Sequence, residues 1–294
     1  MNYERDNKIW RVLGPLFAFL GIRFLVEALG YVFLWHKEFK EINLSAAFNG
    51  ILYVKEFGEK VEGYTLIMSG ISLLVSIPIM YLLMKKDYEY PINPRKKVNE
   101  FSLKKYLIKI DYKSMNYPVI LGITASLGIS RFITMLPFDG ILGSYRAVQK
   151  NVMLNSIPVQ LVILGILTPI LEEILFRGII FKRLKTYYEV TIAAYMAAII
   201  FGIAHFNLIQ GLYAFVLGIV LTYIYEKSGN IVAIIFMHSA ANITAIIMSI
   251  NPISKFIDNH IFIRIAVSVV MIGAFVKCFL VLYEKNRKEE EKNF

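Results

Sequence analysis

The chain has 294 residues, of which 57% are hydrophobic and 18% are charged. A soluble domain of this length needs far fewer apolar residues, so the composition excludes an ordinary water-soluble protein and indicates a membrane protein. The net charge of +10 does not predict a nucleic-acid partner, because the basic residues gather between apolar stretches. The single cysteine, Cys278, excludes an internal disulfide and a CxxC metal or redox site.

Apolar stretches long enough for a helix to cross about 30 Å of hydrocarbon recur along the chain. We therefore predict an all-α, polytopic membrane protein with about eight transmembrane helices, embedded in the lipid bilayer of the cell membrane. The first stretch is too long, and too interrupted by charge, for a cleaved signal peptide. In chain order the predicted spans are Val12–Trp35, Gly63–Met84, Pro118–Leu136, Ile157–Phe181, Val190–Phe206, Gly211–Tyr225, Ile231–Ile250 and Ile265–Tyr283.

The distribution of basic residues predicts the orientation of these spans. Of the 32 lysines and arginines, 20 lie in segments on the same side as the N-terminus. Because cytoplasmic loops carry the excess of such residues, both termini are predicted to be cytoplasmic. The longest polar segment, Lys85–Tyr117, is expected to lie on the anionic inner leaflet, and substrate docking is an alternative role for it.

Two spans near the N-terminus contain charged side chains that need an explanation at membrane depth. Arg23 and Glu27 are four residues apart, which predicts an ion pair on one helix face. Arg131 has no partner nearby in the sequence, and we expect its side chain to reach toward the outer interface. A substrate carboxylate and an acid on another helix are alternative partners for Arg131.

The fourth span contains two adjacent carboxylates, Glu172 and Glu173, in an otherwise apolar helix. Glu173 and Arg177 are four residues apart with the acid first, a spacing that favours an ion pair on one face. Glu172 is rotated by roughly 100° from Glu173 on an α-helix. We therefore predict that Glu172 faces a cavity that contains water, while Glu173 and Arg177 have a supporting role.

Three further polar side chains are predicted at the same depth as Glu172. The fifth span ends with Phe201 and His205, and a hairpin between antiparallel helices would place His205 level with Glu172. In the seventh span His238 and Asn242 lie on one face, because they are four residues apart. Counting along the helices puts His238 and Glu172 at about 13 and 15 Å into the bilayer.

These side chains form a set that can hydrolyse a peptide bond. Glu172 would act as the base and His205 would share the water, while His238 and Asn242 would stabilise the oxyanion. All five aspartates lie outside the predicted spans, which disfavours an aspartyl protease, and no histidine begins an HExxH motif. No metal or other cofactor is expected, although two histidines and a glutamate are also a sufficient zinc ligand set.

The three motifs resemble those of the CPBP family of intramembrane glutamic endopeptidases, which includes type II CAAX prenyl endopeptidases and bacteriocin-processing or immunity proteins. The family pattern EExxxR corresponds to Glu172, Glu173 and Arg177, FxxxH to Phe201 and His205, and HxxxN to His238 and Asn242. The resemblance implies a helical fold with a cytoplasm-facing conical cavity, metal-independent proteolysis, and water activation by the first glutamate and the first histidine.

We therefore divide the chain into N-terminal membrane helices with a basic cytoplasmic loop (1–150), a catalytic core (151–255), and a last transmembrane helix with a charged tail (256–294). The leading hypothesis is an endopeptidase that cuts a membrane-associated peptide or protein, whether or not that substrate is lipidated. The alternatives are a non-catalytic scaffold or immunity protein, and a proton-coupled transporter, which the absence of inverted repeats disfavours.

Overall fold

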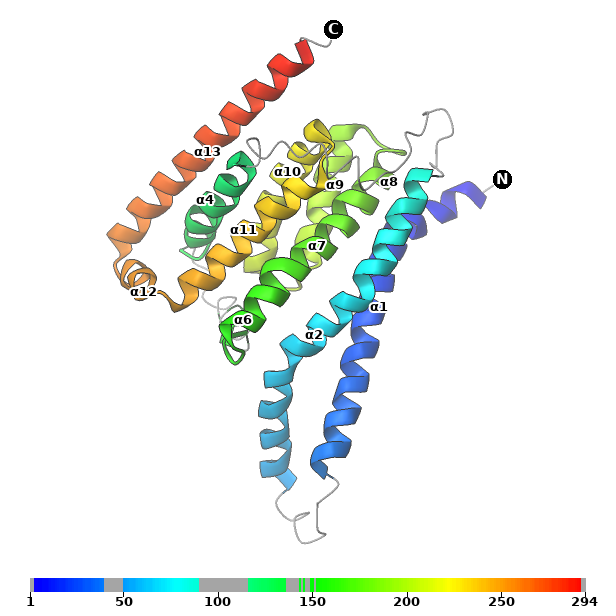
Figure 1. Cartoon of the computed structure of the whole chain (residues 1–294), viewed down its shortest axis with the longest axis vertical. Helices are drawn as coiled ribbons and strands as arrows, with labels where there is room; N and C mark the ends of the chain where they lie inside the picture. Colours follow the sequence, from blue (N-terminus) through cyan, green and yellow to red (C-terminus); the bar gives the residue numbers. More distant parts are fainter. Residues whose placement is uncertain are drawn as a thin grey trace.

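The computed structural model describes residues 3–39, 50–89, 116–135, 143, 145, 149–150 and 152–291. Within these residues the regular structure is entirely helical (Figure 1). Most of the basic segment Lys85–Tyr117 lies outside the described residues, and its predicted role stays a prediction. The helices are α1 (Tyr3–Phe39), α2 (Gly50–Glu89), α4 (Asn116–Ile133), α6 (Ile157–Gln160), η2 (Leu161–Leu167), α7 (Thr168–Glu173), η3 (Ile174–Phe181), α8 (Lys182–Leu184), α9 (Val190–Ile203), α10 (Leu208–Ser228), α11 (Ile231–Ile250), α12 (Pro252–Asn259) and α13 (Ile261–Glu291).

Each predicted span corresponds to helical structure, and α6 to α8 together form the fourth span. Six described helices are long and apolar enough to cross a membrane. They are Lys8–Lys37, Val61–Tyr88, Ile157–Leu184, Leu208–Ser228, Ile231–Ile250 and Ile261–Glu284. The α9 helix has only 14 residues, and α4, with 18, is not among the six. The prediction of an all-α, polytopic membrane protein is confirmed.

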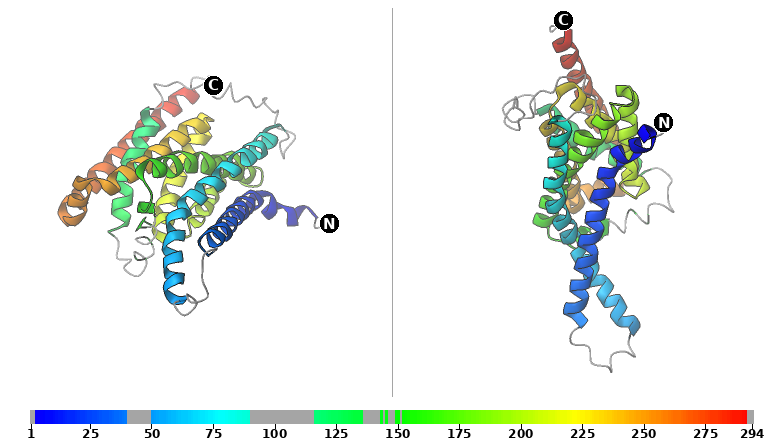
Figure 2. Two further views of the ribbon diagram at one scale, coloured as in Figure 1. Left: turned by 60° about the horizontal axis from the view of Figure 1, so that its bottom comes forward. Right: turned by 90° about the vertical axis from the view of Figure 1, so that its right-hand side faces the viewer.

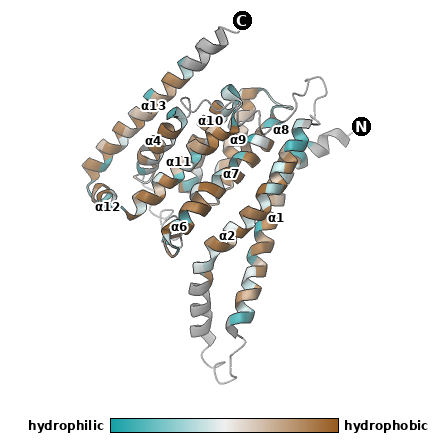
Figure 3. Cartoon of the chain, in the orientation of Figure 1, coloured by the Kyte–Doolittle hydropathy of each residue, from teal (hydrophilic) through white to brown (hydrophobic). Residues whose placement is uncertain are grey.

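Large apolar side chains on the outer helices face away from the protein, as a membrane requires. Phe24 on α1 is 70% exposed and Phe262 on α13 is 84% exposed. Hydrophobic residues cover much of α11 and α13 (Figure 3). In water such a surface would be costly, but hydrocarbon solvates it, so these faces are lipid-facing.

The two ends of the bundle differ in the chain segments that they hold. The chain termini and α8 lie at one end, while α6 and α12 lie at the other (Figures 1 and 2). We call these the terminal end and the distal end. The α1 and α2 helices form one edge of the bundle, and their distal portions extend away from the other helices (Figure 1).

The α4 helix packs between α11 and α13, and two glycines allow the close approach on its two sides. A Cβ atom on Gly122 would clash with the carbonyl oxygen of Met237, next to His238. A Cβ atom on Gly128 would lie 2.9 Å from the backbone nitrogen of Ile272 on α13. Backbone atoms cannot move aside as a flexible side chain can, so both contacts require glycine.

Replacing Gly122 by alanine is therefore expected to destabilise the protein by about 1–3 kcal/mol, because the added methyl group forces α4 and α11 apart. The measurement is the free energy of unfolding in detergent micelles. Gly21→Ala is the matched control, because a Cβ atom on Gly21 meets nothing within 4 Å. Equal stabilities of the two variants would contradict the close helix contact.

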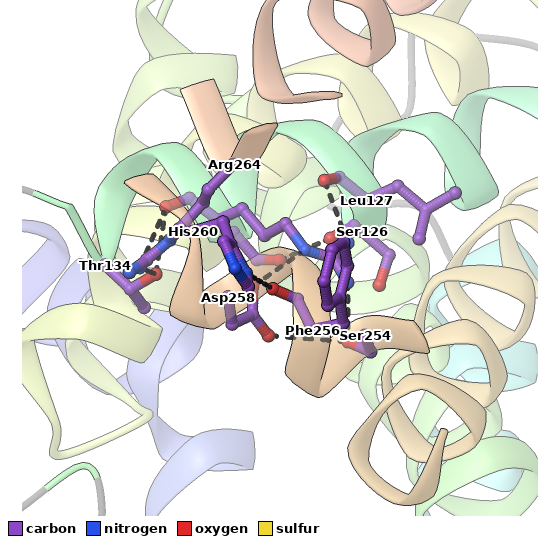
Figure 4. A network of polar contacts seen from close by, with 10 residues as sticks. Ser126, Leu127, Thr134, Ser254, Phe256, Asp258, His260 and Arg264 are labelled. Atoms are coloured by element: carbon purple, nitrogen blue, oxygen red, sulfur yellow. Dashed lines mark hydrogen bonds and ion pairs between the residues drawn. The ribbon is translucent and has the colours of Figure 1, made fainter. Parts of the chain in front are cut away.

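Arg131 corrects one expectation from the sequence. Its side chain is buried and pairs with an acid on another helix, which was one of the alternatives named from the sequence. Its Nε donates to Asp258 Oδ1 at 3.1 Å, and its Nη2 donates to Ser254 Oγ at 2.7 Å (Figure 4). Asp258 and Ser254 lie on α12, a short helix that a search for long apolar stretches misses. Arg131 thus links α4 to α12. Arg23 and Glu27 form the expected ion pair at 2.8 Å.

Candidate active site

The helix that carries the two carboxylates departs from regular α-helical geometry on both sides of them. The π-helical segments η2 and η3 flank the single α-helical segment α7, which ends with Glu172 and Glu173. The backbone N–H of Thr168 donates to Ile163 O, five residues back. Such π-helical segments often occur at functional sites, where they change the direction of side chains.

The π-helical geometry also explains how Asn242 is held. Thr168 N–H donates to Ile163 O, and Pro169 has no N–H, so the carbonyl of Leu164 loses its usual helical donors. The Nδ2 of Asn242 donates to this carbonyl at 2.8 Å. One amide hydrogen of Asn242 thus joins α11 to the fourth span, and the second hydrogen remains for another acceptor.

Glu173 and Arg177 form the ion pair that their spacing predicted, with 2.9 Å between Arg177 Nη1 and Glu173 Oε1. Both side chains are at least 99% buried. Arg177 also donates to the carbonyl of Gly218 at 3.1 Å and to the hydroxyl of Thr222 at 3.4 Å, both on α10. Its guanidinium lies 4.5 Å from the ring centroid of Phe201. Arg177 therefore joins the fourth span to α9 and α10.

His238 lies between the two carboxylates. Its Nδ1 is 2.7 Å from Glu173 Oε1, and its Nε2 is 3.6 Å from Glu172 Oε2. Because Glu173 Oε1 also accepts from Arg177, Nδ1 of His238 is assigned as the donor in this hydrogen bond. Glu173 therefore orients the ring so that Nε2 is directed toward Glu172.

His205 lies just after the end of α9, in the turn that leads to α10. Its Nδ1 is 2.8 Å from the carbonyl of Phe201, so this nitrogen donates and Nε2 is the nitrogen left for other contacts. The next residue, Phe206, has φ 51°, a left-handed conformation that turns the chain sharply. The Phe201 ring packs edge-on against His205, His238 and Phe176, at centroid distances of 4.9, 5.9 and 4.8 Å.

The four predicted catalytic side chains, Glu172, His205, His238 and Asn242, line a single cavity of 610 Å³. The Glu172 side chain is 19% exposed, whereas Glu173 is completely buried. The adjacent carboxylates thus have different surroundings, as their rotation on the helix predicted. His205 makes no hydrogen bond or ion pair with Glu172 in the described part of the chain, so a water or a substrate has to connect them.

Two features of the site were missed in the sequence. The contact between Glu173 and His238 joins residues 65 positions apart, and no local spacing indicates it. The contacts of Arg177 with Gly218 and Thr222 were weakly indicated by the sequence, because these two residues are four apart and so lie on one face of an apolar helix.

A metal site is not evident from the donor geometry. In the described ranges, no three His, Cys, Asp or Glu side chains are grouped as ligands of a metal ion. Glu173 Oε1 already accepts from both Arg177 and His238. These hydrogen bonds leave Glu172 and the Nε2 atoms of His205 and His238 for other contacts, so the zinc version of the site stays an alternative.

The fold and the cavity define a polytopic helical membrane protein with carboxylate, imidazole and amide groups at one intramembrane site. Residues 154–244 match the sequence model of the family described as type II CAAX prenyl endopeptidase Rce1-like. All seven predicted site and supporting residues lie within this range, and the predicted resemblance to this group of membrane proteases is confirmed.

One curated relative comes from Bacillus subtilis (strain 168) and is named "Putative membrane peptidase YdiL". It is 27% identical over 152 residues, which cover 48% of this chain and 62% of the relative. The chain therefore matches less than two thirds of that relative's length. No solved structure matches the chain.

Proposed function

We propose that this protein is an intramembrane glutamic endopeptidase that hydrolyses a peptide bond of a membrane-associated peptide or protein. The observation that carries the proposal is the meeting of Glu172, His205, His238 and Asn242 at one cavity. The matches to a membrane-protease family and to a protein named as a membrane peptidase support the same class. Ionised groups at membrane depth are costly, and catalysis gives a reason for them.

In the proposed mechanism Glu172 and His205 activate the water molecule. The Nδ1 of His205 donates to the Phe201 carbonyl, so the neutral imidazole offers an acceptor at Nε2 that can orient a water molecule. Glu172 removes a proton from this water as the water oxygen bonds to the carbonyl carbon of the substrate. The same proton then passes to the nitrogen of the leaving amine when the C–N bond breaks.

The oxyanion of the tetrahedral intermediate is stabilised from α11. The proposed step requires a hydrogen on both ring nitrogens of His238. In that form Nδ1–H donates to Glu173 and Nε2–H is available to the oxyanion. The second amide hydrogen of Asn242 is the other donor, and the hydrogen bond to Leu164 holds this amide in place.

A zinc-dependent hydrolase is the alternative that uses the same residues, and chelation separates the two mechanisms. The purified protein, reconstituted in lipid vesicles, is incubated with a peptide precursor that accumulates uncut in cells lacking the protein. We expect cleavage to continue at an unchanged rate after prolonged treatment with a chelator and removal of bound metal. Loss of cleavage that added Zn²⁺ restores would contradict the metal-independent mechanism.

A non-catalytic scaffold or immunity protein is the second candidate, because several motif residues also hold helices together. Arg177 joins three helices, and Asn242 joins α11 to the fourth span. Glu172 does not fit this interpretation. It makes no hydrogen bond in the described part of the chain, and its one ion-pair contact, to His238, is 3.6 Å long.

A further inference from the structure

The cavity at the proposed active site extends toward the distal end of the bundle. Residues that line it include Thr134 near the end of α4, Gln160 at the end of α6 and Ser249 near the end of α11. Glu62, which is exposed, and Met153, which is 49% exposed, also line it. The exposed lining residues indicate an opening to the surroundings at the distal end.

At the terminal end the cavity is closed. No residue between Phe176 and Phe201, and none between Leu217 and His238, lines it. These two intervals contain the parts of the fourth span, α9, α10 and α11 that run to the terminal end. Every residue of η3 is buried there, and Phe181 and Leu221 are completely inaccessible. Such a packed layer separates the cavity from the terminal side. A second cavity of 640 Å³ lies along α2, the fourth span and α11 and reaches Tyr225 and Ile231, but none of the four predicted catalytic side chains lines it.

The charge distribution orients the two ends of the bundle in the membrane. The 20 lysines and arginines counted on the N-terminal side include Lys182, Arg183 and Lys185, which follow η3 at the terminal end. Excess positive charge next to the spans marks the cytoplasmic side. The open distal end of the cavity therefore faces away from the cytoplasm.

We propose that the substrate reaches Glu172 from the extracytoplasmic side, as an extended peptide segment at or within the outer leaflet. This inference rests on the proposed peptidase function. It departs from the cytoplasm-facing cavity that the family resemblance implies, because that orientation and cytoplasmic termini are incompatible in this structure. The peptide bond would be cut while its segment lies in the outer half of the bilayer, or after the segment has crossed that half.

The chemistry of the distal cavity wall suits an extended peptide. Its polar part includes neutral hydroxyl and amide groups from α2, α4 and α6 and two charged side chains: Thr65, Ser69, Ser72, Ser126, Ser130, Gln160, Arg23 and Glu62. Such groups can hydrate the cavity and can exchange hydrogen bonds with a peptide backbone. Aliphatic residues such as Leu66 and Ile163 line the rest, where apolar side chains of the substrate can pack.

Cysteine labelling in whole cells tests the orientation without any assay of hydrolysis. In a Cys278→Ser background, Glu62→Cys places a thiol at the distal cavity wall, and Glu189→Cys places one at the terminal end. Both positions are exposed glutamates, so each variant is the matched control of the other. Met153→Cys is a second distal position.

With a membrane-impermeant maleimide we expect intact cells to label the Glu62→Cys and Met153→Cys variants at least ten times faster than the Glu189→Cys variant. Permeabilised cells should label all three. Protection of the two distal positions in intact cells, or labelling of Glu189→Cys there, overturns the proposed orientation. Either of these labelling results would contradict the orientation but not the peptidase function. A failed cleavage assay together with the expected labelling would contradict the peptidase function but not the orientation.

Discussion

The Glu172→Gln variant is expected to lose cleavage activity by a factor of about 10³ or more while keeping its fold. Glutamine has nearly the same shape as glutamate but cannot take a proton from water, and general base catalysis typically contributes about 10²–10⁴ in rate. Glu172 makes no hydrogen bond to the rest of the described protein, so the substitution removes little structural support. The measurement is the initial rate of precursor cleavage in lipid vesicles, together with the unfolding transition.

Glu27→Gln is the matched control for this experiment. It also removes one carboxylate from an apolar helix, and Glu27 lies outside the cavity, whereas its ion-pair partner Arg23 on α1 lines the cavity far from the predicted catalytic side chains in the sequence. We expect this control to keep full cleavage activity. If the folded Glu172→Gln protein retains full cleavage activity in vesicles, Glu172 is not the base. If the unaltered protein cleaves no precursor in vesicles and Glu172→Gln keeps full function in cells, the scaffold hypothesis replaces the peptidase hypothesis.

Local helix geometry explains which parts of the site could be predicted. The α7 segment has regular α-helical geometry, so the rotation between Glu172 and Glu173 was correctly derived from their order alone. The ion pair between Glu173 and Arg177 also survives the π-helical geometry of η3. The side-chain arrangements that depend on neighbouring residues of one helix were therefore accessible from the sequence.

The parts that could not be predicted depend on contacts between helices. Pro169 and the π-helical segment η2 expose the carbonyl of Leu164, but nothing local indicates that Asn242, 78 positions away, fills the gap. Arg131 was expected to reach the interface because no partner is near it in the sequence. Its partner Asp258 is 127 positions away, so nothing local favoured the alternative of an acid on another helix. The same limit applied to the cavity, because its open end depends on how the helices pack.

Replacing Arg177 by methionine is expected to destabilise the protein by about 3–5 kcal/mol, because it leaves the carboxylate of Glu173 buried without its cation. Methionine keeps most of the side-chain volume, so the loss reports charge and hydrogen bonding rather than a cavity. The free energy of unfolding in detergent micelles is the measurement. Arg23→Met is the control, since its ion pair is partly exposed and should contribute about 1 kcal/mol or less.

A second substitution tests the cause of this destabilisation. The Arg177→Met, Glu173→Gln double variant removes the buried negative charge as well as the cation, so it should recover part of the lost stability. It should not recover activity, because glutamine at position 173 no longer stabilises a doubly protonated His238. A double variant as unstable as Arg177→Met alone would show that Arg177 acts through its contacts with Gly218, Thr222 and Phe201, and not by neutralising Glu173.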